Sequence, residues 1–272
     1  MIKFIVSDLD GTLLNSEKAI PGNLHVVIEQ LAARSILFCA ASGRSRASIL
    51  NYFGDIPVTI VANNGGMAYS ADGDLLFIGD FSYEMAKPIL DVVRETPYMH
   101  AALCGLDGIY VQEDAPDEHK EFVNFFFNNQ VKTISRLEDA FAVDRIAKIS
   151  INTGPHGRNE LKGMELMKQF EEEFCLVLSG DGWVDLMRKD VSKGAAFVRV
   201  CEHYNIDISE TMAFGDYIND LDMLMRTPNS YAVANAHPDV KKVCTNVLPY
   251  TNNEQGVIRA LVELFGLEGI ST

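Results

Sequence analysis

Two aspartates near the start of the chain, Asp8 and Asp10, are separated by one residue and followed by Gly11 and Thr12. Carboxylates this close repel each other unless a proton or a cation lies between them. A lone Asp or Gly is common where a strand turns, but this whole run after an apolar strand is much less common by chance. The spacing therefore indicates a site that presents acid groups and not only a packed turn.

The elements that position these groups are apolar runs typical of buried parallel strands. Each run ends in a polar tip, and in an open α/β sheet the carboxyl ends of the strands line one crevice. The tips are Asp8 with Asp10, then Ser42, then Asn63 with Asn64, then Asp216 with Asn219 and Asp220, and finally Asn235. The sequence therefore predicts that side chains from distant parts of the chain meet at one edge of a sheet.

Strand, polar tip and helix alternate along both ends of the chain, which is the sequence form of repeated βαβ units. The expected strands cover residues 4–8, 36–41, 58–62, 211–214 and 230–233, and the expected helices 24–34, 46–53, 193–203 and 256–265. This pattern predicts an α/β fold with a Rossmann-like, doubly wound parallel sheet.

The pattern changes in the middle of the chain, where short strands mix with helical stretches near 83–94, 118–129 and 158–174. This mixture is typical of an α+β module with an antiparallel sheet. We therefore predict a discontinuous core of residues 1–82 and 187–272 and an inserted domain of residues 83–186.

Composition narrows the classes of partner. The 272 residues carry a formal net charge of -15, which argues against nucleic acid or an anionic membrane as a partner. Five scattered cysteines without a C-x-x-C pair predict neither disulfides nor a zinc site. The sequence has no run of 18 apolar residues, so no membrane span is expected. Asp8 comes too early for the apolar region of a signal peptide, and a cytoplasmic location is therefore expected. The oligomeric state cannot be read from the sequence.

The polar tips also indicate a metal. Carboxylate oxygens without histidine or cysteine suit Mg²⁺ and disfavour zinc and copper. A magnesium ion together with a serine hydroxyl, backbone amides next to glycine and a lysine would hold a phosphate group.

Four segments carry a resemblance to a known family. Asp8-Leu9-Asp10-Gly11-Thr12, Ser42-Gly43-Arg44, Lys193, and Gly215-Asp216-Tyr217-Ile218-Asn219-Asp220 resemble the four ordered motifs of the haloacid dehalogenase-like (HAD) hydrolase superfamily. The insert lies between the second and third motifs, where C2-type caps of that superfamily occur. Asn64-Gly65-Gly66 and the tail at 235–236 and 253–257 resemble the Cof-type (HAD-IIB) phosphatases. Tyr217 and Ile218 depart from the family's usual residues, and Tyr217 could narrow the site.

The resemblance implies a role for each motif residue. Asp8 would be the nucleophile that forms an aspartyl-phosphate, Asp10 the general acid and base, and Lys193 the group that neutralises charge on Asp8 and phosphate. The implied Mg²⁺ ligands are Asp8, Asp10 through its backbone carbonyl, Asp216, and Asn219 or Asp220. The implied phosphate-binding and substrate-binding residues are Ser42, Gly43, Arg44, Asn64, Thr12, Lys193 and Asn219, with Thr12 also holding Asp10 in place.

Simpler readings stay open for single residues, because Ser42 and Asp220 could be helix caps and Lys193 a solvated lysine. The predicted function is a Mg²⁺-dependent phosphomonoester hydrolase for a small phosphorylated metabolite, with a sugar phosphate expected and a cap that selects the leaving group. Alternatives are a phosphotransferase or phosphomutase of sugar phosphates and a non-catalytic metabolite-binding module. A dinucleotide-dependent oxidoreductase is disfavoured, since no G-x-G-x-x-G follows the first strand.

Overall fold

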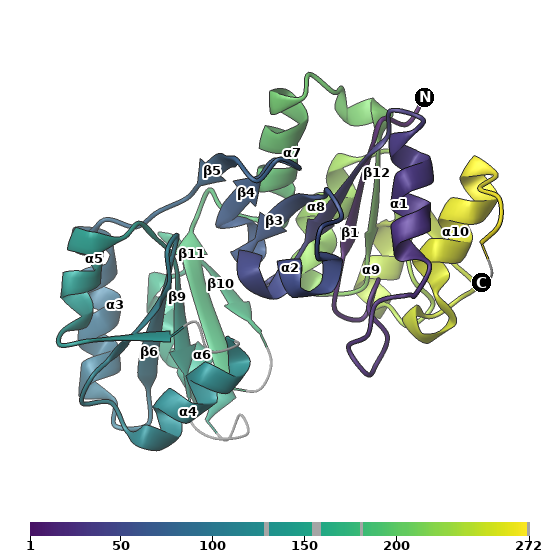
Figure 1. Ribbon diagram of the computed structural model, residues 1–272. Coiled ribbons are helices and arrows are strands. Elements are labelled where there is room, and N and C mark those ends of the chain that lie inside the picture. The colour runs from purple at the N-terminus through teal and green to yellow at the C-terminus, as the bar shows by residue number, and fades with distance from the viewer. Residues whose placement is uncertain (128–130, 154–158, 180–181, 271–272) are drawn as a thin grey trace. The chain divides into compact units, whose positions relative to one another are not determined.

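The computed structural model describes residues 1–127, 131–153, 159–179 and 182–270 (Figure 1). The chain divides into two compact units, one formed by Met1–Phe77 with Ser192–Thr272 and the other by Ile78–Val191. These borders lie five residues outside the insert expected from the sequence. The reason is local, because Phe81 forms a β-bridge with Ile146 and so joins the second unit.

An eight-stranded sheet forms the centre of the first unit, in the order β14-β13-β12-β1-β2-β3-β4-β5. Pairing is parallel from β14 to β3, and β4 runs antiparallel to β3. The strands are β1 (Phe4–Asp8), β2 (Leu37–Ala41), β3 (Thr59–Ala62), β4 (Met67–Tyr69), β5 (Leu75–Ile78), β12 (Thr211–Gly215), β13 (Ser230–Ala232) and β14 (Asn246–Val247). The predicted parallel α/β sheet is confirmed.

Helices cover both faces of this sheet (Figure 1). They are α1 (Leu24–Ala32), α2 (Arg46–Phe53), α7 (Lys193–His203), α8 (Leu221–Arg226), α9 (Pro238–Val243) and α10 (Gly256–Phe265). α1 packs against α10, and α7 packs against α8. The ring of Phe4 on β1 stacks on that of Phe197 on α7, with centroids 5.7 Å apart. Burial on both faces explains why the central strands are apolar throughout.

The register of the parallel strands brings their carboxyl ends together. Ser7 lies beside Phe214 of β12, and Asp8 lies beside Ala41 of β2. Asp216 and Ser42 each follow the last residue of those neighbouring strands. Their side chains therefore begin at the same edge of the sheet as Asp8.

The second unit contains a six-stranded sheet in the order β10-β11-β9-β6-β7-β8. Pairing is antiparallel except between β7 and β8, which are parallel. The strands are β6 (His100–Gly105), β7 (Ile109–Gln112), β8 (Val131–Ile134), β9 (Ile146–Asn152), β10 (Phe174–Leu178) and β11 (Trp183–Arg188), and the helices α3 (Tyr83–Glu95), α4 (Asp117–Phe126), α5 (Ala140–Val143) and α6 (Glu160–Met167).

Two helices of this unit are shorter than the sequence suggested. The stretch expected at 118–129 is α4, which ends at Phe126, and residue 129 lies outside the described residues. The stretch expected at 158–174 is α6 followed by a 3-10 turn at Lys168–Phe170, and residue 158 is also outside the described residues. The chain must leave the helix early because Phe174 already pairs with Arg188 in the sheet.

A buried ion pair joins two adjacent strands of the second unit. Lys148 Nζ on β9 lies 2.9 Å from Asp185 Oδ2 on β11, and both side chains are almost fully buried. Ser150 and Ser179 each donate a hydrogen bond to the same carboxylate. These three hydrogen bonds offset part of the free-energy cost of burying the carboxylate.

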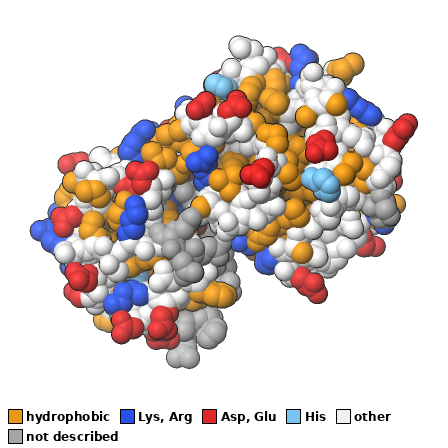
Figure 2. Space-filling model, viewed as in Figure 1, with side chains coloured by type: hydrophobic (Ala, Val, Ile, Leu, Met, Phe, Trp, Pro, Cys, Tyr) orange, Lys and Arg blue, Asp and Glu red, His pale blue; other side chains and the backbone are white. Residues whose placement is uncertain are grey.

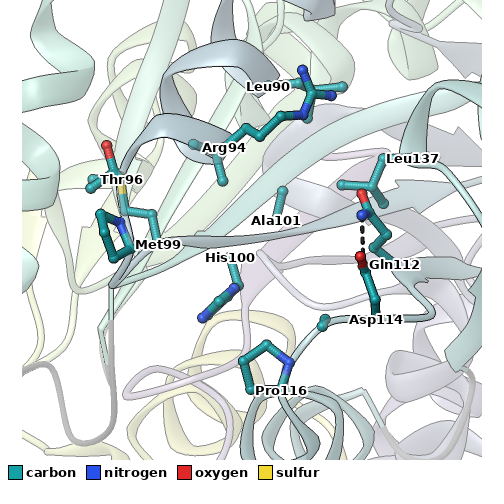
Figure 3. A pocket seen from close by; sticks show the side chains of 13 residues that line it. Leu90, Arg94, Thr96, Met99, His100, Ala101, Gln112, Asp114, Pro116 and Leu137 are labelled. Atoms are coloured by element: carbon teal, nitrogen blue, oxygen red, sulfur yellow. Dashed lines mark hydrogen bonds between the residues drawn. The ribbon is translucent and has the colours of Figure 1, made fainter.

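A cavity of about 230 Å³ lies in the second unit (Figure 3). Its lining residues fall between Leu90 and Leu137, so it includes none of the predicted site residues. Among its polar groups, Gln112 Nε2 donates to Asp114 Oδ1 at 2.6 Å. The predicted chemistry therefore has to be sought in the first unit.

In the described parts of the chain, no helix combines the length and the apolar character needed to cross a bilayer. On the face drawn in Figure 2, acidic and basic side chains are interspersed among apolar ones. Local charge at a binding site must then come from the residues that line it.

Candidate active site

Asp8, Lys193 and Asp220 form a buried chain of charges at the carboxyl end of β1. Lys193 Nζ lies 2.6 Å from Asp8 Oδ1 and 2.7 Å from Asp220 Oδ1. The three side chains are 6%, 1% and 0% exposed, respectively. Lys193 and Asp8, 185 positions apart in sequence, are thus in direct contact, and the possibility that Lys193 is a solvated lysine is excluded.

Two local features bring Lys193 to this position. Ser192 is the N-cap of α7 and accepts a hydrogen bond from the backbone N–H of Ala195 at 2.9 Å, so Lys193 opens the helix. Gly65, with φ +96°, packs so closely on this turn that a Cβ there would lie 2.1 Å from the Ser192 carbonyl oxygen. Only glycine allows the loop after β3 to approach the start of α7 in this way.

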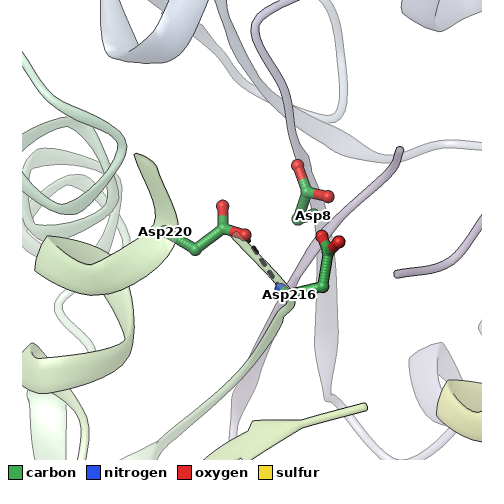
Figure 4. A group of neighbouring side chains, drawn as sticks. All are labelled: Asp8, Asp216 and Asp220. Atoms are coloured by element: carbon green, nitrogen blue, oxygen red, sulfur yellow. Dashed lines mark hydrogen bonds between the residues drawn. The ribbon is translucent and has the colours of Figure 1, made fainter. Parts of the chain in front are cut away.

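A third carboxylate, Asp216, completes a cluster with Asp8 and Asp220 (Figure 4). One oxygen of each lies within 4.8 Å of the others. Thr12 Oγ1 donates to Asp216 Oδ1 at 2.9 Å, so the idea that Thr12 holds Asp10 is wrong: it holds Asp216. Gly11, with φ +84°, also faces Asp216, since a Cβ there would lie 2.4 Å from Asp216 Oδ2.

Asp220 is largely occupied by hydrogen bonds within the protein. Its Oδ1 accepts from Lys193, and its Oδ2 accepts from the backbone N–H groups of Asp216 and Tyr217 at 3.0 and 3.1 Å. The simpler interpretation, that Asp220 caps the next helix, is wrong: its side chain makes no capping hydrogen bond to α8, and instead closes the turn after β12 and anchors Lys193. Asp8 and Asp216 retain more unused oxygen lone pairs than Asp220 does.

The cluster carries more negative than positive charge, which is reflected in the pKa values of its residues. Burial, and then the charge of Asp220, raise the pKa of Asp8 well above its usual range. The same two causes raise the pKa of Asp216 to about 6. For Lys193 burial acts to lower the pKa, but the carboxylates of Asp220 and Asp8 outweigh it and raise the pKa. Three carboxylates with one lysine leave two negative charges, which a divalent cation would balance.

These shifts predict how stability depends on pH in EDTA-treated protein. Between about pH 4 and pH 6, folded Asp216 holds a proton that the unfolded chain has lost, so the free energy of unfolding should fall as pH rises, on the order of 2 kcal/mol. Urea unfolding of the wild type and of Asp216→Asn isolates this contribution. The free energy of unfolding of the variant should exceed that of the wild type at pH 7, and the two values should be equal near pH 4. A higher value for the wild type at pH 7 would contradict the expectation.

Asp10 is not part of this cluster and is held by two cations. Arg44 Nε lies 2.7 Å from Asp10 Oδ2, Arg44 Nη2 2.8 Å from Oδ1, and Lys18 Nζ 2.8 Å from Oδ1. Burial alone would raise the pKa of Asp10, but the hydrogen bonds and charges of Arg44 and Lys18 lower it to about 2. Lys18 was not among the residues expected at the site, because it lies in a polar segment with no motif spacing.

The residues expected to bind phosphate lie at the ends of β2 and β3. Ser42 is buried, and its Oγ accepts the backbone N–H of Arg44 at 3.2 Å. Gly43 lies against the side-chain amide of Asn64, whose Oδ1 accepts a hydrogen bond from Asn219 Nδ2 at 3.1 Å. The structure thus brings Gly43, Asn64 and Asn219 together. A direct bond from Asn219 to a metal stays a prediction, as does one from the carbonyl of Asp10.

The departure from the family motif at Tyr217 and Ile218 leaves the carboxylates in place. Both side chains are exposed, at 54% and 42%. The ring of Tyr217 meets that of His237 edge-on, with centroids 5.9 Å apart. The pair of substitutions therefore changes the surface of the loop and not the acid cluster beneath it.

The donor set fits Mg²⁺. The cluster offers only carboxylate oxygens, carries excess negative charge and is held in place by Lys193, Thr12 and backbone N–H groups. Among the described residues, no group of three or more His, Cys, Asp or Glu ligands other than Asp8, Asp216 and Asp220 comes together in this way.

Comparison with known proteins identifies the family. A family model described as haloacid dehalogenase-like hydrolase matches residues 5–261. The chain belongs to this family. The resemblance seen in the four motifs is thereby confirmed over nearly the whole length of the chain, the second unit included.

Relatives of the chain are named as phosphatases, in agreement with the predicted enzyme class. An Escherichia coli K12 protein named 5-amino-6-(5-phospho-D-ribitylamino)uracil phosphatase YbjI is 26% identical over 94% of this chain and 94% of its own. A protein of Escherichia fergusonii named HMP-PP phosphatase is 25% identical over 89% of this chain and 87% of its own. The two names give different substrates, so they do not single out one substrate for this HAD-like protein.

Solved structures show the same fold. A Thermotoga maritima protein, TM0651, is 27% identical, with a TM-score of 0.82 over 100% of this chain and 98% of its own. A Streptococcus mutans protein, SMU.1108c, is 25% identical, with a TM-score of 0.83 over 98% and 100%. Coverage this complete includes both compact units of the HAD-like chain.

Proposed function

We propose that this HAD-like hydrolase is a Mg²⁺-dependent phosphomonoester hydrolase that acts on a small phosphorylated metabolite, with sugar phosphates as the expected class. The observation that supports it most strongly is the buried cluster of Asp8, Asp216 and Asp220 around a single lysine. Three carboxylates with one lysine leave two negative charges, and a divalent cation would balance them and provide a site for a phosphoester.

In this proposal Asp8 is the nucleophile. One of its oxygens attacks phosphorus, forms the aspartyl-phosphate and displaces the leaving alcohol. Lys193, 2.6 Å from Asp8, favours the ionised form of this carboxylate against the opposing effect of burial, and offsets negative charge on the phosphoryl group. Ser42 and the Gly43 amide bind phosphoryl oxygens at the ends of the neighbouring strand.

Asp10 would move the protons of both steps. It protonates the leaving alcohol in the first step and takes a proton from the attacking water in the second, after which the bond between Asp8 and phosphorus breaks. Asp10 is ionised while Arg44 and Lys18 hold it. We therefore infer that substrate binding draws at least one of these cations away, so that Asp10 takes up a proton from solvent before it donates one to the leaving alcohol.

Asp8 and Asp216 would hold the Mg²⁺ directly with the backbone carbonyl of Asp10, and Asn219 would reach it directly or through water. When bound, the ion would neutralise negative charge on the phosphoester. Asp220 serves this arrangement by fixing Lys193 and the turn after β12.

We also propose that the second unit is a C2-type cap. It interrupts the core between Arg44 and Lys193, the position expected from the family. In this role it would exclude water during the reaction and choose the leaving group.

The test is release of inorganic phosphate from p-nitrophenyl phosphate and from a panel of sugar phosphates, with Mg²⁺ and with excess EDTA. Release should require Mg²⁺ and fall at least about 100-fold in EDTA. Product analysis in the presence of free sugars separates hydrolysis from phosphoryl transfer. Equal rates in EDTA, or no release from any ester, would overturn the proposal.

A further inference from the structure

The turn that carries Lys18 is built by Asn15. Asn15 Oδ1 accepts the backbone N–H groups of Glu17 and Ala19 at 3.0 and 2.9 Å, and the Asn15 N–H donates to the Ala19 carbonyl at 3.1 Å. Inside this turn Lys18 has φ +61°, a left-handed conformation that is unfavourable for a residue with a long side chain. Strain of this kind persists only where surrounding contacts hold it, and such residues cluster at functional sites.

Two residues from the far end of the chain hold the turn against the core. Asn252 Nδ2 donates to the Leu14 carbonyl at 2.8 Å, and Asn253 Oδ1 accepts the N–H of Ser16 at 2.8 Å. Asn252 is buried. The turn that carries Lys18 is therefore held against the core through Leu14 and Ser16.

The charges around Asp10 do not balance. Lys18 and Arg44 both contact this carboxylate, which leaves one positive charge uncompensated. The side chains of Lys18 and Arg44 are 57% and 27% exposed, whereas that of Lys193 is 1% exposed. The site thus has an inner lysine beside the nucleophile and an outer pair of cations beside the proposed acid.

Lys18 and Arg44, the outer pair of cations, lie next to the position that the leaving group would occupy. If Asp10 protonates the leaving oxygen, as the proposed function requires, the rest of the leaving group begins within reach of Lys18 and Arg44. We propose that these two side chains bind a second anionic group, a carboxylate or a further phosphate, carried by the leaving group of the substrate. This inference rests on the proposed function and narrows its substrate class to esters with two anionic groups.

Matched pairs of phosphate esters test the inference as inhibitors of p-nitrophenyl phosphate hydrolysis. The first pair is 3-phosphoglycerate and glycerol 3-phosphate, which differ by a carboxylate, and the second is fructose 1,6-bisphosphate and fructose 6-phosphate, which differ by a phosphate. The wild type should bind the doubly anionic member of at least one pair about tenfold more tightly, as expected for one partly exposed charge-assisted contact. In Lys18→Ala and Lys18→Gln this ratio should fall to within about twofold.

Lys3→Ala is the matched control. Lys3 forms an ion pair of 2.8 Å with Glu210, and its side chain is 51% exposed, much like that of Lys18. It lies just before the amino end of β1, whereas the active-site residues lie at the carboxyl end. Its variant should keep the wild-type ratio. A wild type with no preference in either pair, or a preference that survives in both Lys18 variants, overturns the inference. So does an equal weakening of both members, which would assign Lys18 to the transferring phosphate. Absence of p-nitrophenyl phosphate hydrolysis in the wild type overturns the proposed function itself.

Discussion

Asp8→Asn should lower the rate of phosphate release on the order of 10⁴-fold or more, because an amide cannot form the phosphoenzyme. Release from p-nitrophenyl phosphate in the presence of Mg²⁺ is the measurement. Asp8→Glu should be similarly impaired, since one added methylene moves the attacking oxygen away from its position beside Lys193.

The Asp8→Asn variant should remain folded. Asp8 is one of three clustered carboxylates, and Lys193 keeps Asp220 as a partner at 2.7 Å. In EDTA at neutral pH its free energy of unfolding should equal or exceed that of the wild type, because the substitution removes a buried charge with a raised pKa. A folded variant that retains more than about a tenth of the wild-type activity would end the assignment of Asp8 as nucleophile.

Lys193→Met should be the most damaging change to stability and also lower activity strongly. Methionine fills a similar volume but leaves Asp8 and Asp220 without their shared cation, and leaving buried charges unpaired costs about 3–5 kcal/mol. Loss of the charge beside the phosphoryl group should lower turnover by about 10² to 10³. Urea unfolding in EDTA at pH 7.5 and phosphate release with Mg²⁺ measure the two effects.

The double variant Lys193→Met with Asp220→Asn separates the two effects. It removes one of the uncompensated carboxylates, while the asparagine oxygen can still accept the backbone N–H groups of Asp216 and Tyr217. Stability should recover in part, whereas activity should not. A single Lys193→Met variant within about 1 kcal/mol of the wild type would show that the lysine does not compensate the cluster.

The sequence was sufficient to predict the sheet and the meeting of its polar tips. Apolar runs such as the one ending at Asp8 are typical of buried parallel strands, and parallel strands bring their carboxyl ends to one edge. The contact between Asp8 and Lys193, 185 residues apart, follows from that topology.

Hydrogen-bond partners within the site could not be predicted in the same way. Thr12 was expected to hold Asp10, but the positive φ of Gly11 turns this segment so that Thr12 reaches Asp216. Lys18 reaches Asp10 only through a turn whose shape depends on Asn15 and on residues more than 230 positions away. Such contacts depend on tertiary packing, which leaves no local spacing to recognise.

The covalent step is tested most directly by locating the phosphoryl group on the protein. Asp10→Asn should slow hydrolysis of the intermediate while p-nitrophenolate, a good leaving group, still departs without a proton donor. After acid quench of this variant with p-nitrophenyl phosphate and Mg²⁺, peptide mass mapping should find one phosphoryl group on Asp8. A phosphoryl group on another residue would contradict the account. So would a burst of p-nitrophenolate release after which no phosphorylated peptide is found.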